Sequence, residues 1–77
     1  MEIKILGTGC AKCRTTQAVV EKVLKDASLD ATITKVEDFM EIMQFNVVTT
    51  PAVVVDGVVK IKGRVPSEAE VRKALNL

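Results

Sequence analysis

Two cysteines, Cys10 and Cys13, carry the reactive chemistry of this 77-residue chain and stand three positions apart. Cysteine thiolates are nucleophiles and metal ligands, so a close pair can be a metal clasp, a structural staple or a reversible electron carrier. The chain contains no histidine, and therefore no imidazole base that would activate either thiol. Activation of a thiolate must come from nearby positive charge or from free backbone N–H groups.

The short spacing argues against a structural staple. A bridge across so small a loop constrains the unfolded chain little, because its entropic effect grows with loop length.

The apolar run at the N-terminus is too short for a signal peptide, and no stretch approaches the roughly 20 apolar residues of a membrane span. We therefore expect a cytoplasmic protein that binds no membrane, in which a close thiol pair is catalytic or metal-binding.

The composition predicts one small globular domain over residues 1–77. The hydrophobic share of 48% is too high for a disordered tail, and the length leaves no room for a second domain. A net charge of +1, with two Phe and no Trp or Tyr, lacks the basic and stacking features of a nucleic-acid binder. We expect a monomer that binds no nucleic acid.

The elements that must position the cysteines follow from the periodicity of apolar residues. Alternation of apolar and polar side chains predicts a strand over residues 1–6. Apolar residues at helical spacing predict a helix from about residue 11 to about residue 27, so that its N-terminus follows Cys10 directly. Free backbone N–H groups and the positive end of the helix dipole would then face the pair and favour thiolate over thiol.

Residues 30–45 are expected to add a strand and a short helix. The strand falls within residues 30–38, and three of its side chains are expected to face a core: Ala31, Ile33 and Val36. The helix, within residues 37–45, is predicted to begin at Glu37 or Asp38 as its N-cap. Its buried stripe is expected to consist of large apolar side chains: Phe39, Met40, Ile42 and Met43.

The remaining third of the chain predicts a β-hairpin and a capped helix. Asp56-Gly57 lies between two valine-rich segments, and both central residues of a two-residue hairpin turn must tolerate positive φ. Ser67 and Glu70 have the spacing of a capping box. The order β-α-β-α-β-β-α predicts an α/β fold with a mixed four-stranded sheet flanked by helices, in which the first two strands are parallel.

This placement predicts different roles for the two cysteines. Cys10 precedes the helix and is expected to be exposed, whereas Cys13 lies in the first helical turn and is partly shielded. Cys10 would attack a substrate disulfide; Cys13 would then attack Cys10, release the reduced substrate and leave a Cys10–Cys13 disulfide. Lys12, between them, adds a positive charge that would favour the thiolate or select a partner.

Three separated motifs, GCAKC, TTPAVVVDG and IKGRVPSEAEVRKAL, together resemble the thioredoxin/glutaredoxin superfamily, and in particular its small archaeal and bacterial redox-active disulfide proteins. The resemblance covers essentially the whole chain. It implies a thioredoxin-like fold and a thiol–disulfide oxidoreductase that acts on disulfide-bearing protein substrates. It also implies that no cofactor is bound and that an external reductase, such as a thioredoxin-reductase-like flavoprotein, supplies electrons to the redox-active disulfide.

The same resemblance implies a substrate groove beside the cysteine pair. In this family the proline of a Thr-Pro pair is cis and faces the disulfide, and Thr50-Pro51 matches that pair. Gly63 matches the family glycine that borders the groove. The expected substrate-binding residues are therefore Thr50, Pro51, Gly63 and Lys12.

Two alternatives from other functional classes remain open. The segment GTGCAKC also resembles the Gly-Met-x-Cys-x-x-Cys loop of small heavy-metal-associated domains, and two thiolates suit Cu(I) or Zn. However, Thr8 stands at the position of that loop's methionine, those domains end in β-α-β, and a tetrahedral zinc site would need further ligands. The other alternative is a purely structural or interaction role.

Overall fold

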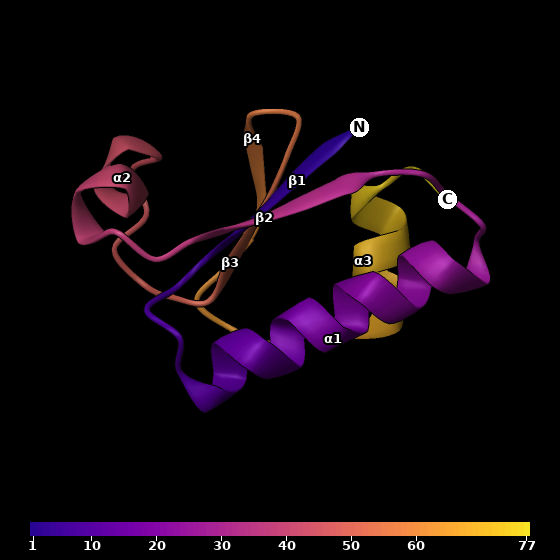
Figure 1. Ribbon diagram of the computed structural model, residues 1–77, viewed down its shortest axis with the longest axis horizontal. Coiled ribbons are helices and arrows are strands. Elements are labelled where there is room, and N and C mark those ends of the chain that lie inside the picture. The colour runs from indigo at the N-terminus through magenta and orange to yellow at the C-terminus, as the bar shows by residue number, and fades with distance from the viewer.

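The computed structural model describes residues 1–77 as a four-stranded sheet with helices packed on it (Figure 1). In chain order the elements are β1 (Glu2–Leu6), α1 (Ala11–Asp26), β2 (Thr32–Val36), α2 (Phe39–Gln44), β3 (Ala52–Val55), β4 (Val58–Lys62) and α3 (Glu68–Ala74). This order confirms the predicted α/β class and the thioredoxin-like succession β-α-β-α-β-β-α.

The sheet has the strand order β2-β1-β3-β4. β1 pairs in parallel with β2 and antiparallel with β3, and β3 forms an antiparallel hairpin with β4. Asp56 and Gly57 in the hairpin turn have φ angles of 49° and 85°, as a two-residue turn of this kind requires. Because Leu6 lies opposite both Val36 and Ala52, the ends of β1 and β2 and the start of β3 meet at one end of the sheet.

Both faces of the sheet are apolar, and different helices cover them. The larger core, with residues from α1 and α3, comprises Ile3, Ile5, Val20, Val23, Leu24, Val53, Val55, Ile61, Val71 and Leu75. The smaller core, with one residue from α2, comprises Leu6, Val36, Ile42, Val47, Ala52 and Val54. Successive side chains of a strand point to opposite faces, so the valine run of β3 is buried throughout.

The strand β2 serves both cores. Ala31 and Ile33 pack, half-buried, against the larger core, whereas Val36 is buried in the smaller core. The expectation that these three residues face a core is confirmed, and the odd spacing between Ile33 and Val36 places them on opposite faces.

The predicted buried stripe of α2 is wrong for three of its four residues. Ile42 is 3% exposed, but the side chains of Phe39, Met40 and Met43 remain 65%, 70% and 42% exposed. The helix has only six residues and starts after Asp38, whose carboxylate accepts a hydrogen bond from the Met40 N–H. In so short a helix only Ile42 packs against the sheet, and the other large apolar side chains remain exposed to solvent.

The ends of the other two helices follow local sequence signals. α1 begins after Cys10 as N-cap and ends at Asp26, one residue before the predicted end, with Ala27 as its C-cap. α3 begins after Ser67, which forms the predicted capping box with Glu70. No helix in the chain combines the length and the apolarity that crossing a membrane requires.

Candidate functional site

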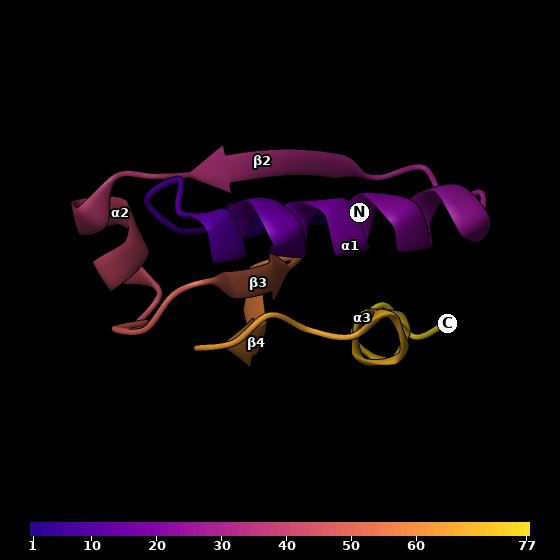
Figure 2. The same ribbon diagram turned by 90° about the horizontal axis from the view of Figure 1, so that it is seen from below.

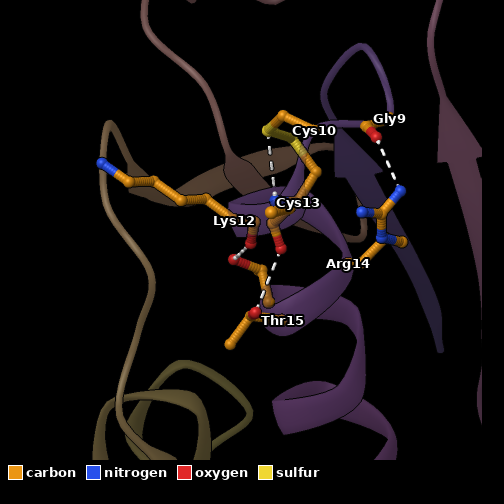
Figure 3. Close-up of a disulfide and its surroundings, with 8 residues drawn as sticks. Gly9, Cys10, Lys12, Cys13, Arg14 and Thr15 are labelled. Carbon is orange, nitrogen blue, oxygen red and sulfur yellow. Dashed lines mark hydrogen bonds between the residues drawn. A yellow bond between two sulfur atoms is a disulfide. The ribbon is translucent and has the colours of Figure 1, made fainter.

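Cys10 and Cys13 form a disulfide at the N-terminus of α1 (Figure 3). Cys10 is exposed and is the N-cap of the helix, and its Sγ accepts a hydrogen bond from the Cys13 backbone N–H at 3.2 Å. Cys13 lies in the first turn and is only 6% exposed. The Cys10 sulfur therefore occupies the position where an N-cap side chain meets the free N–H groups and the positive end of the helix dipole.

Two basic residues, Lys12 and Arg14, lie in the first turn of α1. The first turn of the helix contains no acidic residue. The Arg14 guanidinium donates a hydrogen bond to the Gly9 carbonyl at 3.3 Å, which holds this cation beside the loop that leads to Cys10. The Lys12 side chain is exposed, forms no ion pair and extends away from the two sulfur atoms (Figure 3).

Gly7 leaves the space that Cys13 fills. Gly7 is buried, and its N–H donates a hydrogen bond to the Val36 carbonyl at 2.9 Å. A Cβ at position 7 would collide with the Sγ of Cys13 and lie 3.1 Å from its Cβ.

Cys13 borders a small cavity of about 10 Å³. Its lining comprises Ile5, Gly7, Gly9, Cys13, Arg14, Lys35 and Glu37. Lys35 and Glu37 were not among the predicted site residues. The parallel pairing of Ile5 with Lys35 brings them there, and no local sequence pattern encodes that register.

The Thr50-Pro51 peptide bond is cis, which confirms what the resemblance implied. Pro51 is buried directly before β3, and Thr50 is half-buried. The Thr50 Cβ lies 3.9 Å from the point that a Cβ on Gly7 would occupy. Gly7 and Thr50, which are 43 positions apart in the chain, thus lie close together beside the buried Cys13.

Gly63 is hydrogen-bonded to the segment that contains Thr50 and Pro51. Its N–H donates a hydrogen bond to the Pro51 carbonyl at 2.9 Å. Its φ is 78°, and a Cβ there would lie 2.9 Å from the Thr49 Oγ1, so both conformation and space favour glycine. Of the expected substrate-binding residues, Thr50, Pro51 and Gly63 lie in adjoining segments, whereas Lys12 lies in the first turn of α1.

No further residues join the cysteine pair to complete a metal site. The structure gathers no group of three or more His, Cys, Asp or Glu side chains. The chain also ends in a hairpin and a helix instead of the β-α-β ending of heavy-metal-associated domains.

Comparisons with known proteins agree with this geometry. Residues 1–76 match the family described as Thioredoxin domain. The chain is 36% identical over 76 residues to a protein named thioredoxin from Methanothermobacter thermautotrophicus, an alignment that covers 99% of each chain. It is 41% identical over 73 residues to a protein named thioredoxin from Methanocaldococcus jannaschii, covering 95% of this chain and 84% of that relative.

Proposed function

This chain belongs to the thioredoxin family and is a thiol–disulfide oxidoreductase, and we propose that Cys10 is its nucleophile and Cys13 its resolving thiol. One observation carries the assignment: an exposed Cys10 is disulfide-bonded to a Cys13 that is only 6% exposed. A substrate disulfide can approach only the sulfur that faces solvent, so the first attack belongs to Cys10.

The reaction begins from the reduced protein. The Cys10 thiolate attacks one sulfur of a substrate disulfide; the substrate S–S bond breaks, a mixed disulfide forms, and the other substrate sulfur leaves as a thiolate. The Cys13 thiolate then attacks the Cys10 Sγ, which releases the second substrate sulfur and forms the Cys10–Cys13 disulfide. The protons lost by the two cysteine thiols are taken up by the two substrate thiolates, so the substrate gains two electrons and two protons.

We assign substrate docking to Thr50 and Pro51. Gly63 borders the substrate groove, and Lys12 contributes a solvent-exposed positive charge beside the disulfide. The Thr50 backbone lies outside the sheet and takes part in none of the turn and loop hydrogen bonds, whereas the Pro51 carbonyl is already engaged by Gly63. An extended substrate segment can therefore pair with the backbone of Thr50 as a short added strand.

Electrons for the next cycle must come from another molecule, because Cys10 and Cys13 are the only cysteines of the chain. We assign this role to an external reductase, a flavoprotein of the thioredoxin-reductase kind. The substrates are disulfide-bearing proteins, and no cofactor bound to this chain is needed for the two exchange steps.

The test is disulfide reduction by pre-reduced protein, freed of reductant, with insulin as substrate. We expect the Cys10→Ser variant to lose activity and the Cys13→Ser variant to accumulate a covalent mixed disulfide visible in a non-reducing gel. Thr15→Ser, which keeps the hydroxyl that bonds the Ala11 carbonyl, is the matched control in the same helical turn. Full activity of Cys10→Ser would overturn the assignment of roles.

A further inference from the structure

The outer face of α2 carries apolar side chains that no part of the fold covers. Phe39, Met40 and Met43 lie within one turn of the same face, and all three are at least 42% exposed. Val48, in the segment that leads from α2 to β3, is 82% exposed. Single apolar residues on a surface are ordinary, but a contiguous group of large ones marks an interaction site. We call these four residues the α2 apolar patch.

The α2 apolar patch lies at the reactive end of the molecule. Figure 2 shows α2 beside the end of β2, at the same end as the loop that enters α1. Glu37, two residues before Phe39, lines the small cavity together with Cys13. Val48 stands two residues before Thr50. A protein segment bound to the disulfide is therefore within reach of the patch.

The charged residues of the chain segment that carries the patch are all acidic. Glu37, Asp38 and Glu41 flank the apolar side chains, and none of them is part of an ion pair. No Lys or Arg occurs between Val36 and Val59. A second copy of this face would bring carboxylates against carboxylates, which is unfavourable. A complementary partner has apolar side chains flanked by Lys or Arg.

We infer that the α2 apolar patch and its three carboxylates form a docking site for a basic, apolar segment of the disulfide-bearing partner protein. The site selects among disulfide substrates by the residues next to their cysteines. This inference rests on the proposed function, because docking has a consequence only if Cys10 then exchanges with the partner's disulfide.

The test compares two synthetic peptide disulfides that differ only in charge. Both contain Leu and Phe beside the cysteine, one with flanking Lys and the other with flanking Glu, and both are reduced in a single turnover by the pre-reduced protein. Each rate is divided by the rate of the same protein with bis(2-hydroxyethyl) disulfide, an uncharged small substrate that reports the reactivity of Cys10. We expect the Lys peptide to be favoured about tenfold, and the preference to shrink at about 0.5 M NaCl because exposed charges are screened.

Two variants assign the preference to α2. The double variant Phe39→Ser/Met40→Ser removes apolar area, and Glu41→Lys reverses one charge without touching the core; each is expected to abolish most of the preference for the Lys peptide. Val58→Ser, at an apolar residue that is 55% exposed on β4, is the matched control and is expected to keep it. If all three variants showed the same preference for the Lys peptide over the Glu peptide, the inference would be overturned.

Two further outcomes are informative. Dimerisation of the protein that Phe39→Ser/Met40→Ser abolishes, seen by analytical ultracentrifugation, would assign the patch to a second copy and overturn the inference. Failure of the unaltered protein to reduce bis(2-hydroxyethyl) disulfide would overturn the proposed function itself, independently of any peptide preference.

Discussion

The backbone N–H of Cys13 points at the Sγ of Cys10 and donates a hydrogen bond to it over 3.2 Å. Once the disulfide is reduced, a donor in this position stabilises a negative charge on the Cys10 sulfur, as does the helix N-terminus around it. The Cys13 sulfur lies under the helix against Gly7 and is hidden from solvent. The same turn of α1 thus prepares one sulfur for attack and shelters the other.

This asymmetry predicts selective alkylation of the reduced protein. Iodoacetamide is expected to modify Cys10 at least about tenfold faster than Cys13, because alkylation requires an accessible thiolate. Mass spectrometry of the peptides after timed quenching measures both rates in one sample. Equal rates at the two cysteines would contradict the proposed difference between them.

The contact between Gly7 and Cys13 predicts that Gly7→Ala destabilises the protein. The added methyl group must displace the buried Cys13 side chain, and overpacking of this kind costs about 1–3 kcal/mol. Urea unfolding of the oxidised protein gives the free energy. Gly57→Ala is the matched control: it has φ of 85° and no atom within 4 Å, so only backbone strain of about 1 kcal/mol applies. A stability of Gly7→Ala equal to that of the unaltered protein would show that the Gly7 contact is not constraining.

We expect the substitution Gly63→Ala to lower the free energy of unfolding through two separable effects. In Gly63→Ala, positive φ costs about 1 kcal/mol, and the contact with the Thr49 side chain adds to it. In the double variant Thr49→Gly/Gly63→Ala the second part disappears, so the effects of the two substitutions are not additive. A double-mutant cycle from thermal unfolding measures this coupling, and strict additivity would argue against the contact.

The pair formed by Arg64 and Glu70 predicts a loss of stability in acid. The hydrogen bond from the Arg64 side chain, followed by that from the Ser67 backbone, lowers the pKa of Glu70 from 4.5 to about 2. A carboxyl group whose pKa is lower in the folded state stabilises the fold above the unfolded value, and this contribution disappears as pH falls through the folded value. The free energy of unfolding should therefore decline between pH 4.5 and about 2.

The Glu70→Gln variant isolates this contribution. The amide keeps an acceptor for the Ser67 N–H but cannot titrate, so the decline in stability over the same pH range should be shallower than in the unaltered protein. Glu41→Gln removes a carboxylate that forms no ion pair and serves as the control. Because the pair is exposed, the difference is expected to be larger at low salt, and identical slopes would contradict the assignment.

Much of the fold was predictable because its signals are local. Asp56-Gly57 fixes the hairpin through the positive φ of both residues, and Ser67 with Glu70 fixes the start of α3 through reciprocal hydrogen bonds. The position of Cys10 as the N-cap of α1 also follows from neighbouring residues alone.

The features that sequence reasoning missed depend on partners distant in the chain. Helical spacing predicted that Phe39 and Met40 are buried. It could not show that only Ile42 of this helix packs against the sheet. The parallel register of β1 and β2 brings Lys35 and Glu37 to Cys13, and no local pattern encodes that register. The same holds for the contact between Gly63 and Thr49.

The hydrogen bond from Gly7 to Val36, together with that from Gly63 to Pro51, means that the reactive end of this protein belongs to no single stretch of chain. Four segments hold it, and each is kept in place by strand pairing. Loss of pairing anywhere along β1 or β3 would separate the thiols from the residues around them. A partly unfolded molecule therefore keeps two cysteines but loses the difference in exposure between them that orders the two exchange steps.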